Sequence, residues 1–154
     1  MIQGAIFSQD RTYRYVLWRV WDDQKPYVLF IGLNPSTADE NVNDQTIRRC
    51  IDYSRRWGYG GFKIVNLFSY RATHPIEMMS APDPIGPDTD RWIDELKREA
   101  DITVICWGNE GGFKKRNQEV LDCLGRVYCL KINNSGEPAH PLRLSKELKP
   151  IPYN

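Results

Sequence analysis

Amide side chains stand where two predicted strands end. Asn34 follows an apolar run at residues 27–32 (YVLFIG), and Asn66 interrupts a second apolar run at residues 62–68. An amide cannot act as a general base at neutral pH, but its carbonyl oxygen can hold a water molecule against an electrophilic carbon. It also offers a donor beside an acceptor, which complements the edge of a nucleobase. Asn34 and Asn66 are therefore candidates for positioning a water and a base.

Histidine and arginine occur in two proline-containing segments. His140 lies in PAHPLRLS (residues 138–145), where the flanking prolines fix the backbone. A positioned imidazole can donate a hydrogen bond to negative charge that develops during a reaction. Arg71 and His74 lie in YRATHP (residues 70–75) and can clamp a phosphate.

Each of these residues also has a structural interpretation. Asn34 can serve the Asn-Pro turn through its tolerance of unusual backbone angles, and a backbone group can satisfy Asn66. Arg71 and His140 can belong to ordinary surface loops. A group of arginines on one predicted helix can form a solvated face or contact nucleic acid; these are Arg48, Arg49, Arg55 and Arg56.

The composition predicts one ordinary globular domain spanning residues 1–154. The 154 residues carry 21 lysines and arginines against 20 acids, a balance that excludes a disordered tail protein and a globally basic nucleic-acid coat. The charge is segregated, because residues 78–101 hold three bases and seven acids whereas residues 114–149 hold eight bases and four acids.

The sequence contains no signal-peptide pattern and no apolar stretch long enough to cross a bilayer, so we expect a cytoplasmic protein without a membrane partner. Its four cysteines lack CxxC spacing, which favours reduced thiols over a metal or cluster site. We therefore expect no metal, no cofactor and no obligate protein partner.

Strands and helices alternate along the chain. Strands are predicted at residues 13–20, 27–32, 62–67, 102–107 and 126–132, and helices after Asp44, after Pro87 and through residues 113–124. This pattern predicts an α/β/α sandwich of three layers on a mostly parallel four-stranded central sheet, with an N-terminal edge strand at residues 13–20. Ligands of such sheets bind beyond the carboxyl ends of the strands, which selects residues 32–36, 66–71, 107–109 and 138–145.

Several common catalytic signatures are absent. The sequence has no GxxxxGK[ST], no GxSxG and no HExxH, and GYGG at residues 58–61 precedes a predicted strand instead of following one. Kinase, dehydrogenase and α/β-hydrolase chemistry are therefore disfavoured.

The motifs as a set resemble a bacterial and phage family of unknown function. They include FIGLNPSTAD (residues 30–39), VNLFSYRATHP (65–75), CWG (106–108) and HPLRLS (140–145). A more distant resemblance is to the uracil-DNA glycosylase superfamily. In that superfamily one strand ends in Gly-x-Asp-Pro or Gly-x-Asn-Pro, a second ends in Asn, a third precedes Trp-Gly, and a late loop holds His-Pro followed by Leu-Ser. The corresponding motifs here are GLNP (32–35), Asn66, ICWG (105–108) with Lys114 and Lys115, and HPLRLS.

The glycosylase resemblance implies a uracil-DNA glycosylase-like fold and a role for each matching residue. Asn34 would position the attacking water, Asn66 would read a pyrimidine edge, and His140 would stabilise the departing base. Asn34 replaces the Asp of the most active branches, which should lower hydrolytic power, and Arg143 can narrow the pocket or pair with a charged substrate. We predict Asn34 and His140 as catalytic residues, and as substrate-binding residues Gly32, Pro35, Ser36, Asn66, Phe68, Arg71, Trp107, Asn109, Arg143 and Ser145.

Three functions remain open at the level of sequence. The first is a nucleobase-directed hydrolase that cleaves the N-glycosidic bond of a modified or deaminated pyrimidine, in DNA through a short, local contact or in a free nucleotide. The second is a non-catalytic nucleotide or nucleic-acid binding protein that keeps the pocket without the chemistry. The third is an enzyme of small nucleosides, which would bind monomers and no strands.

Overall fold

A seven-stranded mixed sheet forms the centre of the molecule. The structure is a computed structural model that describes residues 1–154. The strands lie in the order β1-β2-β4-β3-β5-β6-β7. Their bounds are β1 (Ile2–Phe7), β2 (Arg14–Val20), β3 (Tyr27–Gly32), β4 (Gly61–Asn66), β5 (Ile102–Ile105), β6 (Tyr128–Cys129) and β7 (Ile151–Pro152). The helices are α1 (Gln45–Arg56), α2 (Pro75–Met79), α3 (Thr89–Glu99), α4 (Arg116–Cys123) and the 3₁₀ segment η1 (Asn109–Lys115).

Four adjacent strands of the sheet, β4, β3, β5 and β6, run parallel. β2 pairs antiparallel with β4, β1 pairs antiparallel with β2, and β7 pairs antiparallel with β6. The central strand β3 is apolar along its whole length, because it is covered on both faces. Its bounds agree with the predicted strand.

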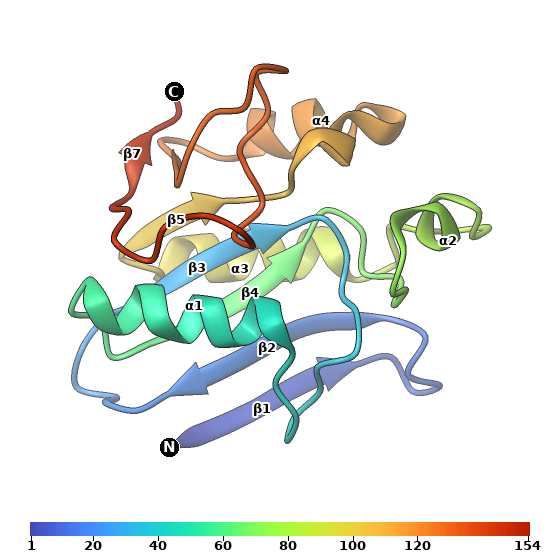
Figure 1. Ribbon diagram of the computed structural model, residues 1–154. Helices are drawn as coiled ribbons and strands as arrows, with labels where there is room; N and C mark the ends of the chain where they lie inside the picture. The colour runs from blue at the N-terminus through green and yellow to red at the C-terminus, as the bar shows by residue number, and fades with distance from the viewer.

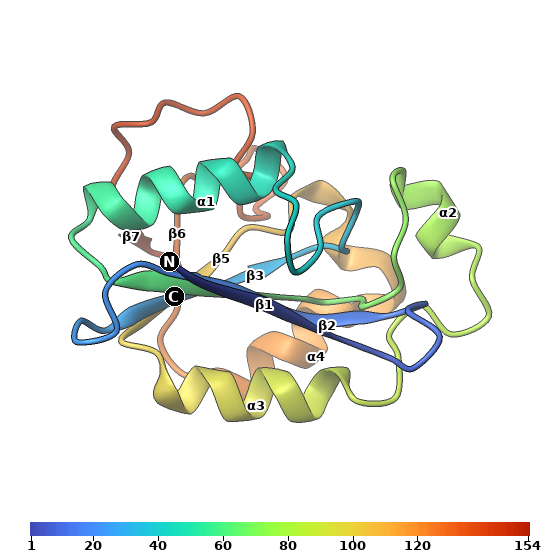
Figure 2. The same ribbon diagram turned by 90° about the horizontal axis from the view of Figure 1, so that it is seen from below.

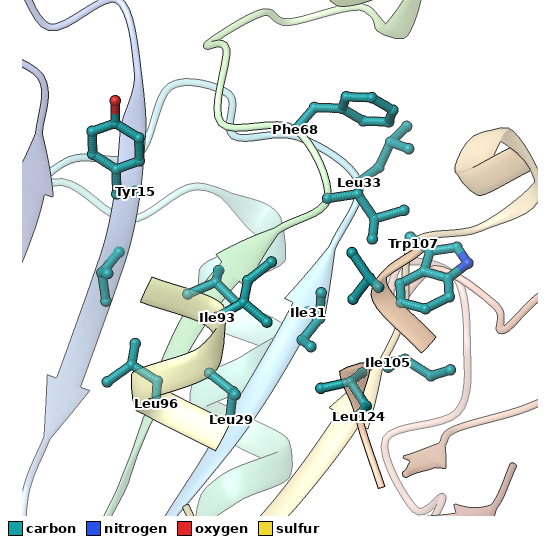
Figure 3. Packing of buried hydrophobic residues seen from close by; sticks show 14 of the residues in the cluster. Tyr15, Leu29, Ile31, Leu33, Phe68, Ile93, Leu96, Ile105, Trp107 and Leu124 are labelled. Atoms are coloured by element: carbon teal, nitrogen blue, oxygen red, sulfur yellow. The ribbon is translucent and has the colours of Figure 1, made fainter. Parts of the chain in front are cut away.

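Helices cover both faces of the sheet (Figure 1). Figure 2 shows α1 on one face and α3 and α4 on the other. Side chains of β3 alternate between the two cores: Leu29 and Ile31 pack on the side of α3, and Val28 and Phe30 pack on the side of α1. Figure 3 shows part of the core that includes Ile31, Ile93 and Trp107.

The helix α1 begins where the sequence predicts it. The Asp44 side chain accepts a hydrogen bond from the backbone N–H of Ile47 (2.9 Å), which satisfies one of the free donors of the first turn. Trp57 closes the helix and Gly58 follows with a positive φ of 83°. The cap thereby fixes the end of α1 that faces the carboxyl ends of β3 and β4.

The mixed α/β prediction is confirmed, but the sheet is larger and less parallel than expected. The predicted edge strand at residues 13–20 is an inner strand, because β1 covers its outer side. β1 and β7 are not predicted, since their residues are partly exposed and follow no clear alternation.

Two further predictions at the carboxyl half were wrong in detail. The helix expected at residues 113–124 is divided, because Lys114 and Lys115 have φ values of 54° and 57° and break the helix between η1 and α4. The strand expected at residues 126–132 shortens to two residues, Tyr128 and Cys129. None of the helices combines the length and the apolar character needed to cross a bilayer.

Candidate functional site

The order in which successive parallel strands are added to the sheet reverses between β3 and β5. From β3 the chain passes through α1 to β4 on one side, and from β5 it passes through α4 to β6 on the other (Figure 1). The loops that follow β3 and β5 diverge at such a point and leave a crevice, which is where ligands bind in open α/β sheets. A cavity of about 660 Å³ lies at these carboxyl ends.

Eight of the twelve predicted site residues line this one cavity. They come from four segments far apart in sequence and are Gly32, Asn34, Pro35, Ser36, Asn66, Trp107, Asn109 and His140. The remaining lining includes two carboxylates, Asp44 and Glu110, and the guanidinium group of Arg14. The fold therefore brings together the side-chain amides of Asn34 and Asn66, the imidazole of His140 and the guanidinium of Arg14.

The amide of Asn34 is held in one orientation. Its Nδ2 donates to the carbonyl oxygens of Ala72 (2.9 Å) and Pro35 (3.1 Å). Both donors of the amide are used by the protein, so the carbonyl oxygen Oδ1 is the atom left to accept from a water or ligand. This geometry suits the water-positioning role that the sequence suggests.

Backbone hydrogen bonds tie the turn after β3 to the loop after β4. The N–H of Leu67 donates to the carbonyl of Gly32 (2.9 Å) and the N–H of Phe68 donates to that of Leu33 (3.0 Å). The N–H of Ala72 then donates to the carbonyl of Pro35 (2.9 Å). These bonds extend the pairing of β3 with β4 beyond the strands and hold the Asn34 turn rigidly.

The side chain of Asn66 is buried without a partner. The residue is 3% exposed, and its Nδ2 has no hydrogen bond in the protein. It pairs in register with Gly32 on β3, where an added Cβ would lie 2.7 Å from Asn66 Oδ1. Glycine is therefore required at position 32 for the amide to reach the cavity, and no backbone group satisfies the amide as the structural interpretation proposed.

We expect Asn66→Leu to leave the fold intact. Because leucine removes an unsatisfied buried amide while keeping its volume, the free energy of unfolding should change by less than about 1 kcal/mol or increase. Urea denaturation followed by circular dichroism measures this change.

The matched control for this variant is Asn43→Leu. Asn43 Oδ1 accepts a hydrogen bond from Arg19 Nε (2.9 Å), so its loss leaves a buried donor unpaired and should cost about 1–3 kcal/mol. A cost of the same size in Asn66→Leu would show that the Asn66 amide supports the folded state.

His140 presents a neutral ring to the cavity. The backbone N–H of Leu142 donates to His140 Nδ1 (3.2 Å), so Nδ1 is an acceptor and the proton of the neutral ring is on Nε2. Desolvation lowers the pKa of His140, against the opposing effect of the Asp44 and Glu110 carboxylates. At pH 7 the imidazole is a neutral hydrogen-bond donor.

The loop after β5 is hydrogen-bonded to the segment that carries His140. Gly108 has a φ of 76°, its N–H donates to the Pro138 carbonyl (2.8 Å), and a Cβ added to it would lie 3.8 Å from the Cβ of His140. Trp107 is 1% exposed and its Nε1 donates to Glu137 (3.2 Å). Trp107 thus contributes a wall of the cavity and fixes the loop that carries His140.

The side-chain oxygen of Asn109 accepts hydrogen bonds from other residues of the protein. Its Oδ1 accepts from Asn133 Nδ2 (3.0 Å) and from Ser135 Oγ (2.6 Å). These bonds connect the start of η1 to the loop after β6. Asn109 therefore lines the cavity chiefly as part of the scaffold that shapes it.

Two predicted residues after β4 do not line the cavity. Phe68 is completely buried, and its ring lies 5.6 Å from that of Phe113 in the core on the α3 side. Arg71 places its guanidinium over the Phe7 ring at 4.8 Å. Their sequence neighbourhood suggested contact with the ligand, but their side chains point to the core and to β1.

Two predicted residues of the last loop also lie outside the cavity. Arg143 lines a neighbouring cavity of about 590 Å³ together with Arg48, Arg49 and Lys146. The carbonyl of Ser145 accepts from the Tyr53 hydroxyl (2.7 Å), and its Oγ accepts from the N–H of Glu147. Ser145 therefore holds the loop against α1.

Arg14 is the only lysine or arginine that lines the cavity, and it was not predicted from the sequence. It stands at the first position of β2, and because β2 is antiparallel to β4 its beginning lies beside the carboxyl ends of the parallel strands. A search of the segments that follow parallel strands cannot find such a residue. The only signal was a basic residue opening a strand that is otherwise largely buried.

The comparisons with known proteins give a family without an activity. A family described as "Protein of unknown function (DUF1643)" matches residues 14–142. No curated protein and no solved structure matches the chain. The matched range begins at Arg14 and includes every residue that lines the cavity.

Proposed function

The chain belongs to the DUF1643 family of proteins of unknown function, and we propose that it is a nucleobase-directed hydrolase that cleaves an N-glycosidic bond. The substrate is a modified or deaminated pyrimidine in DNA or in a nucleotide. One observation carries the proposal: Asn34, Asn66 and His140 line a single cavity, although 32 and 74 residues of sequence separate neighbouring members of the set.

Each side chain supplies one part of this reaction. Asn34 Oδ1 holds a water against the anomeric carbon, and the buried Asn66 amide pairs with the edge of the base. As the glycosidic bond breaks, its electron pair moves to the base and His140 Nε2–H stabilises the resulting negative charge. The water oxygen bonds to the carbon and its proton passes to solvent or to the departing base.

The arrangement of strands supports a uracil-DNA glycosylase-like fold. The four parallel strands β4, β3, β5 and β6 have helices on both faces, and the segments that resemble that superfamily follow β3, β4, β5 and β6. Three of those segments contribute an amide or imidazole to the cavity and the fourth contributes its Trp-Gly wall. Within this proposal β1, β2 and β7 are additions at the two edges of the sheet.

The neighbouring basic cavity supports a short contact with nucleic acid. It shares Gln45 and Leu142 with the first cavity, and Arg48, Arg49, Arg143 and Lys146 outnumber its one acid, Asp52. A phosphate of an adjacent nucleotide could contact these side chains while the base occupies the first cavity. The proposed partners are therefore a nucleic acid bound over a short stretch or a free nucleotide.

Asn34→Ala tests the proposal directly. Loss of the acceptor that holds the water should reduce the rate of abasic-site formation by about 10²-fold, because a positioned water contributes on this scale. Asn34→Asp should raise the rate, since a carboxylate accepts more strongly than an amide. The assay uses oligonucleotides and nucleotides that contain uracil, hydroxymethyluracil or glucosylated bases.

A non-catalytic binding protein is the second candidate. The water-holding group is an amide and not a carboxylate, which favours recognition over turnover. Measurable affinity for bases or oligonucleotides together with intact substrate across the whole panel would support this candidate and exclude the hydrolase. The dependence of affinity on salt would then report how many phosphates are contacted.

A further inference from the structure

Three arginines are almost completely buried, and one of them differs from the other two. Arg19 is 0% exposed and donates to four backbone carbonyls and to Asn43 with bonds of 2.7–3.5 Å. Arg116 is 1% exposed, donates to the Leu67 carbonyl (2.8 Å) and pairs with Asp90 and Glu119. The side chains of both arginines have hydrogen-bond or ion-pair partners within the protein, and neither lines the cavity.

Arg14 is 3% exposed and lines the cavity. Its side chain makes one hydrogen bond, from Nη1 to the Ala38 carbonyl (3.1 Å), and its Nε is shielded from solvent without a partner. It has no ion pair. A buried guanidinium whose five N–H donors find only one acceptor in the protein is costly in free energy, and proteins retain such a group where it has a function.

A register shift in the outer strands directs Arg14 into the cavity. Ile6 on β1 pairs with Val16 on β2, but the next residue, Phe7, pairs with Arg14, so Tyr15 is left without a partner. The extra residue places Arg14 on the same face as Leu17, toward α1, whereas Tyr15 and Val16 both pack in the opposite core. Bulges of this kind re-aim side chains beside functional sites.

Charges of both signs lie around Arg14, and none of the acids forms an ion pair with it. The pKa of Arg14 is lowered to about 10, chiefly by burial; Asp44 raises it, and Arg71 and Arg19 contribute smaller lowering effects. The first turn of α1 also lines the cavity through Gln45 and Thr46, and the N-terminus of a helix favours negative charge. Of the two carboxylates that line the cavity, Asp44 is the one that raises the pKa of Arg14, and its side chain already accepts from the Ile47 N–H.

We infer that Arg14 binds an oxyanion of the ligand, so that the molecule held beside Asn34, Asn66 and His140 is a negatively charged nucleotide and not a neutral nucleoside. A guanidinium matches the oxygens of phosphate and carboxylate groups with two parallel hydrogen bonds. That the ligand is a nucleotide rests on the proposed function. That the ligand carries a negative charge follows from Arg14 alone.

The oxyanion can be the 5′-phosphate or an acidic substituent on the base. The experiment measures the affinity of the full-length protein for three probes by isothermal titration calorimetry: deoxyuridine, deoxyuridine 5′-monophosphate and 5-carboxydeoxyuridine. We expect one charged probe to bind at least about 10-fold more tightly than deoxyuridine, which is the scale of one charge-assisted pair. The probe that shows this preference identifies the source of the charge.

Arg14→Met and Arg14→Lys assign the preference to this side chain. In Arg14→Met the charged and neutral probes should bind equally, with the affinity for deoxyuridine unchanged. Arg14→Lys should retain part of the preference, because it keeps the charge and loses the two-pronged geometry. Equal affinity for all three probes in the wild-type protein, or a charge preference that survives in Arg14→Met, would overturn the inference.

Stability separates a binding role from a structural one. Without ligand, Arg14→Met should have a Tm equal to or above that of the wild type, because methionine fills a similar volume without an unsatisfied charge. Failure of the hydrolase proposal gives anion binding without cleavage, whereas failure of the present inference gives cleavage with no Arg14-dependent preference for charge. The two results are distinguishable.

Discussion

His140→Ala is expected to lower kcat/KM for the proposed N-glycosidic cleavage by about 10²–10³-fold, the range found when a single donor to a developing anion is removed. Substrate binding should change much less, because the hydrogen bond from Nε2 strengthens only as charge collects on the departing base. The measurement is the rate of abasic-site formation under single-turnover conditions with the best substrate of the panel. Affinity is measured separately on an uncleavable analogue.

The pH dependence of the reaction should report the same side chain. The protein around His140 lowers its pKa below the ordinary value of 6.5, so the ring stays neutral as the pH falls to 6.5 and is protonated only below it. Protonation places a second proton on Nδ1 and breaks the bond from the Leu142 N–H. The acid limb of kcat/KM should therefore lie below pH 6.5.

The control is His140→Gln, whose side-chain amide can donate from a similar position without titrating. This variant should recover part of the rate and show no acid limb. Near wild-type kcat/KM in His140→Ala would remove His140 from the mechanism. The lowered pKa also predicts that His140 destabilises the fold as the pH falls through 6.5, because the unfolded chain then binds more protons.

Arg19→Met is expected to lower the free energy of unfolding by about 3–5 kcal/mol, because several buried acceptors lose their donor at a cost of about 1–3 kcal/mol each. Arg19 holds the loop before α1 by donating to the carbonyls of Asp39 (2.7 Å) and Val42 (3.3 Å). Methionine fills the space but leaves these buried acceptors and Asn43 without donors. A loss of this size should lower the Tm by roughly 6–20 °C in a chain of this length.

Arg14→Met is the matched comparison, because both arginines lie on β2, face α1 and contact the loop before that helix. The two variants make the same chemical change on one strand, and only Arg19 has its donors satisfied. Thermal unfolding of both in the absence of ligand provides the test. Equal losses of stability would mean that Arg14 is as much a structural residue as Arg19.

The apolar pattern of the inner strands was enough to predict the centre of the fold. β3 and α1 occur where continuous hydrophobicity, the Asp44 cap and Gly58 place them, because these signals are local and strong. β1, β7 and the break at Lys114 escaped prediction. Pairing with distant strands decides whether an ambiguous segment becomes a strand, and backbone strain at two lysines is not encoded in any pattern of hydrophobicity.

The sequence by itself determined the chemistry available to this protein, which is neutral amides at the ends of apolar strands and an imidazole in a late loop. Residue types and strand ends are local features, so they can be identified from the sequence alone. Tertiary structure decided which of these side chains share a cavity. Phe68 is buried in the core and Arg143 lines the neighbouring cavity. Arg14 lines the first cavity because β2 is antiparallel to β4 and the register shift turns its side chain toward α1. Strand direction and register depend on long-range pairing, so the cation that completes the site is visible only in the folded molecule.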